Sequence, residues 1–193
     1  MKLSLTAVLA VASLTFVVPA WAQDPLAEFP DVMNASAVRA DGERVISLSV
    51  FIPVPTQDVW TALTTEGGWV THMGVAQARL DMRIGGDIET SYSKDEPLGG
   101  PGTIVNQIVA YVPERMLAIR NTRAPASFDH AAEFGQTVTV IELTPQDGGT
   151  RVDLHGVGFV SGAAFDALYA MFLVGDAYTL QRLRESLTAV SSH

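Results

Sequence analysis

The stretch RLDMRIGGDIET, residues 79 to 90, predicts two half-buried strands that fold back on each other. Apolar and polar residues alternate along it, which is the pattern of a strand with one buried face. The apolar positions are Leu80, Met82, Ile84 and, after a break, Ile88. The break is Gly85-Gly86, and glycine suits a tight turn because it adopts positive φ without a Cβ clash. The pattern therefore predicts strands at 76–84 and 86–93 that share one apolar face.

Five more segments are predicted to be strands, and glycine and proline turn signals separate them. They cover residues 43–52, 103–112, 115–122, 136–144 and 150–159. A short helix is expected after the first of them, because Pro55 suits a first helical turn and Asp58 favours the positive N-terminal end. A shorter helical turn is expected at 66–72. The connection at 121–135 has no clear period and is expected to be a functional or mobile loop.

The last predicted element is a helix at about 163–189, whose apolar residues recur every three or four positions. Its stripe consists of Phe165, Leu168, Tyr169, Phe172, Leu180, Leu183 and Leu187. About seven strands, with a short helical insertion after strand 1 and one long terminal helix, do not make a βαβ repeat. The order predicts an α+β fold in which an antiparallel sheet carries its helices on one side.

Residues 1–22 have the features of a secretory signal, with a lysine at position 2, an apolar run and small residues before Ala22. A membrane anchor is the other interpretation, but the run is short and is interrupted by serine and threonine. We therefore expect cleavage after Ala22, an extended lead-in at 23–41 and one domain at 42–193. The mature protein is expected in the periplasm or the medium, without a membrane span.

Composition excludes several classes of function. The chain has 12 Lys and Arg against 21 Asp and Glu, and its net charge of −9 disfavours nucleic acid and anionic lipid as partners. It has no cysteine, which excludes a disulfide scaffold and a thiol enzyme. Four scattered histidines without an HExxH motif predict no metal site. Phosphate loops and dinucleotide fingerprints are absent, so no cofactor is expected.

Several motifs, in their order and spacing, resemble one known superfamily. They are PTQDVWTALT at 55–64, MRIGG at 82–86, GTI at 102–104, GGTRV at 148–152 and GF at 158–159. The chain resembles the SRPBCC superfamily (START/Bet v 1-like), in its activator-of-Hsp90-ATPase homologue (AHSA1-like) branch, over about residues 43–188. The resemblance implies a helix-grip fold, in which a curved antiparallel sheet wraps the C-terminal helix and encloses an apolar cavity. Taken alone, the glycines favour an ordinary hairpin with no cavity behind it.

One departure from the family concerns the terminal helix. Many members carry a Gly-Trp pair ahead of two leucines, whereas this chain has Gly175-Asp176. At about 100° per residue, Asp176 falls near the centre of the apolar stripe and is expected to point at the sheet. A buried carboxylate needs a partner, a hydrated pocket or a proton. The alternative is a helix that is rotated or irregular at Gly175, which would leave Asp176 in solvent.

The leading hypothesis is a binding protein for a small apolar or amphipathic molecule. Its expected ligand contacts are Trp69, Phe165, Tyr169, Phe172 and Asp176. The alternative is a cavity enzyme, because related helix-grip proteins include cyclases, dehydratases and hydrolases. Its candidate acid and base residues are Asp176, His72 and Tyr178. A chaperone-binding module fits poorly, because the namesake of the branch acts on a cytosolic chaperone and the expected signal directs this chain elsewhere.

Overall fold

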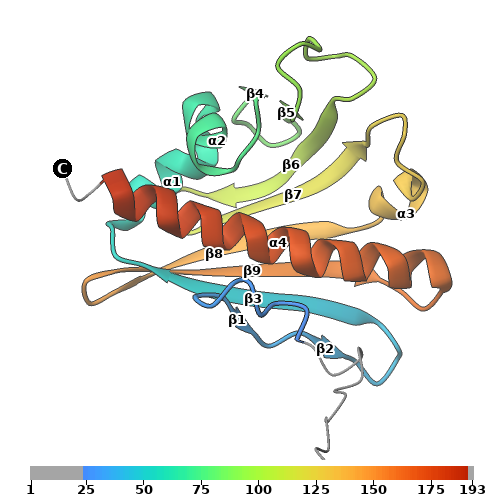
Figure 1. Cartoon of the computed structure of the whole chain (residues 1–193), viewed down its shortest axis with the longest axis horizontal. Helices are drawn as coiled ribbons and strands as arrows, with labels where there is room; N and C mark the ends of the chain where they lie inside the picture. The colour runs from blue at the N-terminus through green and yellow to red at the C-terminus, as the bar shows by residue number, and fades with distance from the viewer. Residues whose placement is uncertain (1–23, 191–193) are drawn as a thin grey trace, which may run out of the picture.

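The computed structural model describes residues 24–190 and confirms the α+β class (Figure 1). The expected signal at 1–22 lies outside the described residues. The elements run in the order β1 (Met33–Asn34), β2 (Ala37–Val38), β3 (Arg44–Ile52), α1 (Thr56–Thr64), α2 (Glu66–His72), β4 (Gln77–Leu80), β5 (Asp87–Ser91), β6 (Ile104–Val112), β7 (Met116–Arg123), α3 (Ala131–Phe134), β8 (Val138–Gln146), β9 (Gly149–Phe159) and α4 (Ala163–Val190).

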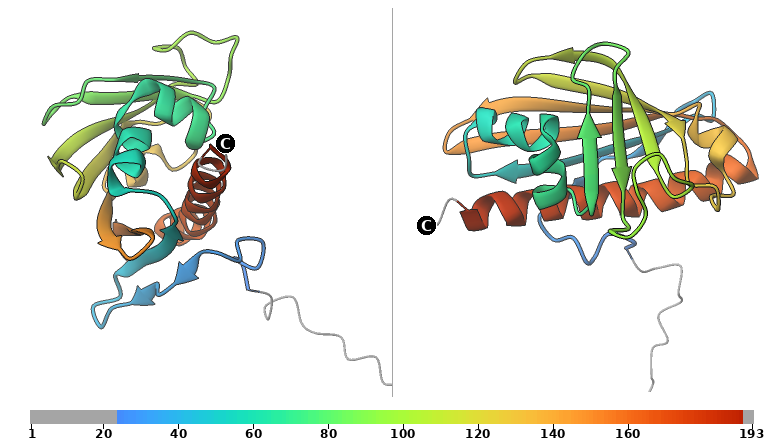
Figure 2. Two further views of the ribbon diagram at one scale, coloured as in Figure 1. Left: turned by 90° about the vertical axis from the view of Figure 1, so that its left-hand side faces the viewer. Right: turned by 90° about the horizontal axis from the view of Figure 1, so that it is seen from above.

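The strands of the described part form one antiparallel sheet in the order β1-β3-β9-β8-β7-β6-β5-β4, with β2 also paired to β3. From β4 to β9 the chain is a meander, and β9 then pairs with β3. Seen end-on, the sheet bends around α4, and α1 and α2 lie beside it (Figure 2). This is the helix-grip arrangement. The sheet has nine strands where seven were expected, because β1 and β2 add to it.

The hairpin that the opening stretch predicts has shorter strands and a longer turn than expected. β4 ends at Leu80 and β5 begins at Asp87, so the strand predicted to reach residue 84 is too long. The N–H of Gly85 donates to the Ile108 carbonyl at 2.8 Å, and the N–H of Ile108 donates to the Gly86 carbonyl at 2.8 Å. The turn is therefore fastened to β6. A Cβ on Gly86 would lie 2.1 Å from the Asp81 carbonyl oxygen, so only glycine fits there.

The lead-in takes part in the fold more than its sequence pattern indicates. Met33 pairs with Ser49 and Ala37 with Val45, so both short strands lie along the outer edge of β3 (Figure 1). Leu26, before them, is 4% exposed and belongs to the hydrophobic core. Strands of two residues are too short for an alternation to be recognised, which is why sequence periodicity does not reveal them.

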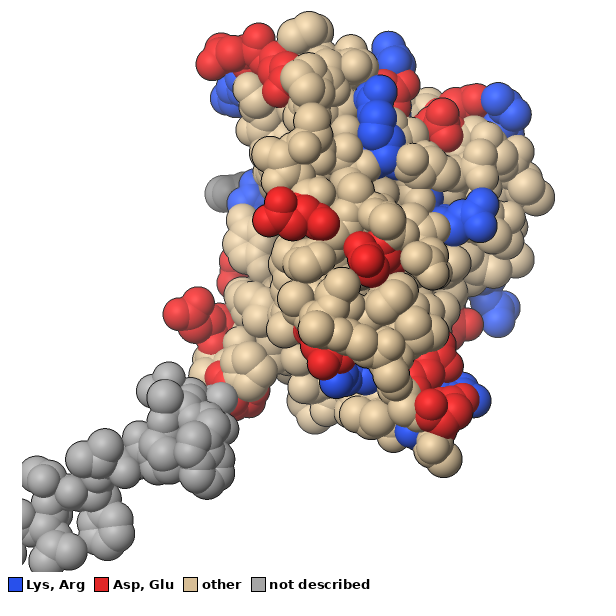
Figure 3. Space-filling model, turned by 90° about the vertical axis from the view of Figure 1, so that its right-hand side faces the viewer, with Lys and Arg blue, Asp and Glu red and all other residues tan. Residues whose placement is uncertain are grey.

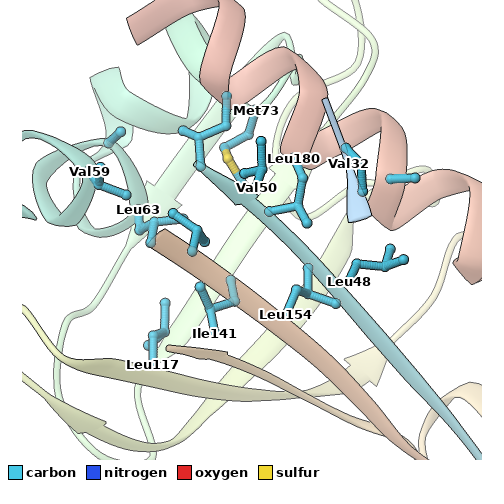
Figure 4. Close-up of a cluster of buried hydrophobic side chains, with 14 of the residues drawn as sticks. Val32, Leu48, Val50, Val59, Leu63, Met73, Leu117, Ile141, Leu154 and Leu180 are labelled. Atoms are coloured by element: carbon cyan, nitrogen blue, oxygen red, sulfur yellow. The ribbon is translucent and has the colours of Figure 1, made fainter. Parts of the chain in front are cut away.

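The core lies where the sheet meets α4. Side chains of β3 and β9 point toward the helix, and Leu48, Leu154 and Leu180 meet there (Figure 4). Leu180 is 2% exposed, and its helical spacing from Leu183 places both on the buried face of α4. At α1, Leu63 closes the same core from one end (Figure 4). The apolar stripe predicted for the terminal helix is therefore the face that the sheet grips.

Acidic and basic side chains are scattered among uncharged residues on the surface, as Figure 3 shows for the face at the right of Figure 1. Arg44 pairs with Asp166 and Arg184 with Asp31, and these bridges fasten α4 to β3 and to the lead-in. None of the helices between residues 24 and 190 is long and apolar enough to cross a membrane.

Candidate ligand-binding cavity

A cavity of about 280 Å³ lies between the middle of α4 and the part of the sheet formed by β5 to β9. This volume is close to the lower end of the range typical of small-molecule sites. The wall consists of Trp69, Met73, Val75, Thr90, Tyr92, Ile104, Asn106, Ile119, Asn121, Pro125, Phe128, Phe134, Thr137, Thr139, Ile141, Leu154, Met171, Phe172, Asp176 and Thr179. Most of these side chains are apolar, and the polar ones are threonine, asparagine, one tyrosine and one aspartate.

The apolar wall is built by alternation on three neighbouring strands. Ile119 of β7, Ile141 of β8 and Leu154 of β9 are 7%, 5% and 3% exposed, and they point to the α4 side of the sheet. The Trp69 ring is fixed in the wall because its Nε1 donates to the Leu63 carbonyl at 2.8 Å. Side chains held in this way give the cavity a shape that does not depend on a guest.

A group of aromatic rings closes one end of the cavity. Phe134 of α3 lies 4.6 Å from Phe172 of α4 between ring centroids, and Phe128 packs edge-on against Phe134 at 5.7 Å. Phe128 and Phe134 come from the connection at 121–135, where α3 forms in a segment expected to be a loop. Sequence reasoning did not select these two residues. The signal that could have found them is the presence of aromatic residues in a long connection without a period.

Two polar residues of the wall donate side-chain hydrogen bonds to backbone carbonyls of β6, β7 and α3. Asn121 is 4% exposed, and its Nδ2 donates to the carbonyls of Val105 at 3.2 Å and Arg123 at 3.0 Å. The Thr137 hydroxyl donates to the Phe134 carbonyl at 2.9 Å. These bonds hold the rim in place and satisfy buried donors.

Asp176 is the one charged residue of the wall, and its carboxyl is uncompensated. α4 runs without a break through Gly175, so the helix presents Asp176 to the sheet side, as its position in the stripe predicts. Its Oδ2 atom is inaccessible to solvent and has no hydrogen-bond partner among the described residues. Desolvation raises the pKa of this carboxyl from its ordinary value of 3.8 to about 7. The pKa of this carboxyl therefore lies near neutral pH.

Tyr92 lies just after β5 on the rim of the cavity, close to Asp176. The residue as a whole is 69% exposed. The pKa of its hydroxyl is raised, first by desolvation and then by the proximity of Tyr178 and Asp176. Tyr92 continues the parity of Ile88 and Thr90, so the alternation in the sequence indicates that it lies on the same face of the strand. Tyr92 is the second titratable side chain of the wall.

The structure brings only part of the expected site together. Trp69, Phe172 and Asp176 lie on the cavity wall. Tyr169 does not, because it stacks edge-on against Phe159 with a centroid distance of 5.6 Å, under the Arg44 guanidinium. Phe165, one turn earlier on α4, is half-buried against the hydrophobic core.

His72 and Tyr178 do not line the cavity. The Nδ1 atom of His72 lies 2.8 Å from the Ser186 hydroxyl, so the ring faces the C-terminal part of α4. Burial and the nearby Arg182 guanidinium lower the pKa of His72. Tyr178 is 49% exposed and packs edge-on against Phe29 at 6.4 Å. Neither residue is a hydrogen-bond partner of the Asp176 Oδ2 atom. No group of three or more metal-ligating side chains gathers anywhere in residues 24–190.

These features define an α+β helix-grip protein with a cavity under its C-terminal helix. The family model described as "Polyketide cyclase / dehydrase and lipid transport" matches residues 43–189, and the chain belongs to this family. The match supports the resemblance at the level of the SRPBCC superfamily. No curated protein matches the chain.

Solved structures share the fold at low sequence identity. Protein NE0264 from Nitrosomonas europaea is 19% identical with a TM-score of 0.59, and the match covers 77% of this chain and 97% of that chain. Protein MLL2253 from Mesorhizobium loti is 17% identical with a TM-score of 0.60, over 76% and 98%. The Aha1 dimer from Colwellia psychrerythraea is 15% identical with a TM-score of 0.57, over 75% and 96%. At these identities the likeness concerns the fold alone.

Proposed function

We propose that this protein binds a small apolar or amphipathic molecule in the cavity between α4 and the sheet. The observation that carries the proposal is a half-open, mainly apolar pocket of about 280 Å³ between α4 and the sheet, with residues of the hydrophobic core in its wall. Small-molecule sites are typically concave and mainly apolar with a few polar groups, so a pocket with this lining indicates room for a guest. The family description, which includes lipid transport, supports the same function.

A matched pair of tryptophan substitutions on β8 tests this function. Thr139 lines the cavity, whereas Thr144 lies on the opposite parity of the same strand and is exposed. We expect 1-octanol to bind the wild-type protein and Thr144→Trp in isothermal titration calorimetry. Thr139→Trp fills the void and should weaken octanol binding at least about tenfold, which is the loss of about 1.4 kcal/mol of binding free energy.

Two results of the octanol titration would contradict the proposed binding function. One is a wild-type protein that does not bind octanol. The other is equal binding to Thr139→Trp and the wild-type protein, provided that circular dichroism shows both to be folded. Thr144→Trp controls for the added indole, because it places the same ring on the same strand without entering the void.

A second candidate is a cavity enzyme, and one observation favours it. A buried carboxyl with a pKa of about 7 is suited to exchange protons at neutral pH, and the Tyr92 hydroxyl lies nearby. In this proposal Asp176 and Tyr92 act as acid and base, in place of the expected His72 and Tyr178. Binding remains the function that the apolar wall supports best.

We also propose that the protein is exported and belongs to the AHSA1-like branch. The apolar run of residues 1–22 with its small-residue end supports export to the periplasm or the medium. The motif at 55–64 supports the branch. N-terminal sequencing of the protein from its own host should begin at Gln23, and an intact Met1 on the mature protein would contradict export.

A further inference from the structure

The wall of the cavity combines an apolar surface with a single unpaired acid. Of the residues that line it, none is Lys, Arg or His, and the titratable ones are Asp176 and Tyr92. The pKa of Asp176 is raised by desolvation alone, so no cation of the protein compensates its charge. The remaining sides of the cavity, from α2, α3 and β6 to β9, present uncharged groups to it. No side chain of the wall supplies a partner for the Asp176 Oδ2 atom.

Three kinds of partner could satisfy the Oδ2 atom of Asp176: a proton, a neutral hydrogen-bond donor or a cation. A proton leaves the carboxyl neutral and requires a second acceptor. A neutral hydroxyl donates a hydrogen bond but leaves the negative charge in a mainly apolar space, which is costly. A protonated amine supplies a donor and a counter-charge together, and charge-assisted hydrogen bonds are about twice as strong as neutral ones. The amine therefore satisfies this site most completely.

We propose that the cavity selects amphipathic molecules with a protonated amine head, which binds the Asp176 carboxylate while the tail packs against Ile119, Leu154 and Phe172. This inference rests on the proposed binding function and adds the chemistry of the head group. The chain's negative net charge, −9, also favours the approach of a cation over that of an anion. Tyr92 stands at the rim, where its hydroxyl can accept a hydrogen bond from the same head group.

The volume guides the choice of probe length. At about 30 Å³ for each water-sized unit, the cavity of about 280 Å³ holds about nine heavy atoms. A straight eight-carbon chain with one head atom has this size. Octylamine and 1-octanol are therefore matched probes of nine heavy atoms that differ only in the head atom, and octanoic acid, with ten heavy atoms, carries a carboxylate at the end of the same eight-carbon chain.

Calorimetric titration of the three probes at pH 7.5 tests the inference. We expect octylamine to bind at least about tenfold more tightly than octanol, and octanoic acid to bind more weakly than octanol, because its carboxylate meets a like charge. Asp176→Asn should reduce octylamine affinity by at least about tenfold and leave octanol affinity within about twofold. Glu185→Gln, an exposed acid on the same helix, should keep the wild-type preference.

The pH dependence gives a second readout. The amine stays protonated to about pH 10, as lysine does, whereas Asp176 ionises around pH 7. Octylamine affinity should rise about tenfold between pH 6 and pH 8 in the wild-type protein and stay flat in Asp176→Asn. Octanol affinity should not rise over this range.

The outcomes separate the inference from the function. If octanol binds but octylamine binds no more tightly, or if octanoic acid binds best, the inference is wrong and the binding function stands. If Asp176→Asn weakens the binding of octanol and octylamine equally, the carboxyl does not distinguish the two head groups and the inference is also wrong. If octanol itself does not bind the wild-type protein, the proposed function fails, and the inference fails with it.

Discussion

Asp176→Asn should raise the free energy of unfolding by about 2–4 kcal/mol at pH 8, with a gain that shrinks as the pH falls and is near zero at pH 4. The pKa of the buried carboxyl, about 7, is above its ordinary value of 3.8, so the native state holds this proton more tightly than the unfolded state does. The stability due to the proton is fully present below about pH 3.8 and is lost as the pH rises through about 7. Asparagine removes that loss because it does not ionise.

Urea unfolding of both proteins across this pH range is the measurement. Any constant offset from burying the amide appears at every pH, so the readout is the difference between pH 8 and pH 4. Glu185→Gln serves as the control and should change stability by less than about 0.5 kcal/mol at either pH, because the residue is exposed and glutamine keeps an oxygen that can accept from the Gln181 Nε2 atom. Parallel stability curves for wild-type and Asp176→Asn proteins would show that Asp176 is solvated.

Leu48→Ala should cost about 3–5 kcal/mol, more than the about 2–3 kcal/mol expected for Leu154→Ala. The two leucines are register partners on β3 and β9, are 1% and 3% exposed, and point toward α4 (Figure 4). Leu154 borders the cavity, so it has fewer packed neighbours to lose on that side. Urea unfolding of the two variants measures the difference directly.

The same pair of variants should differ in ligand preference. Leu154→Ala removes three carbon atoms from the wall, which makes room for about three more methylenes at about 0.8 kcal/mol each. We expect 1-undecanol to gain about 30-fold or more over 1-octanol in Leu154→Ala, relative to the wild-type protein. Leu48→Ala should show no such change. Equal losses of stability and unchanged chain-length preference in both variants would contradict a cavity beside Leu154.

Much of the fold could be predicted from periodicity. The strands β3 and β6 to β9 begin and end within two residues of the predicted segments, and α4 does so as well. The prediction succeeds because burial on one face of a strand or helix determines the spacing of its apolar residues. It failed at Met82 and Ile84, which keep the alternation although β4 has already ended. There the backbone bonds of Gly85 and Gly86 to Ile108 of β6 decide the structure, and periodicity does not report them.

The candidate site could be predicted only where one helix face decides the position. Asp176 shares the apolar stripe of α4, and its placement on the cavity wall follows from helical spacing. The position of His72 depends instead on how α2 packs along α4, where Ser186 meets it. Phe128 and Phe134 depend on the path of the long connection. Such contacts between distant segments leave no local period, so sequence spacing alone does not place these residues.

The central claim is that α4 and the sheet leave an unfilled volume between them. A crystal structure of the protein without residues 1–22, pressurised with xenon, tests it most directly, because xenon occupies apolar cavities that exclude water. We expect xenon density bounded by Ile119, Leu154 and Phe172. Side chains that meet under α4 with neither void nor xenon between them would contradict the claim, and with it the binding of any guest at this place.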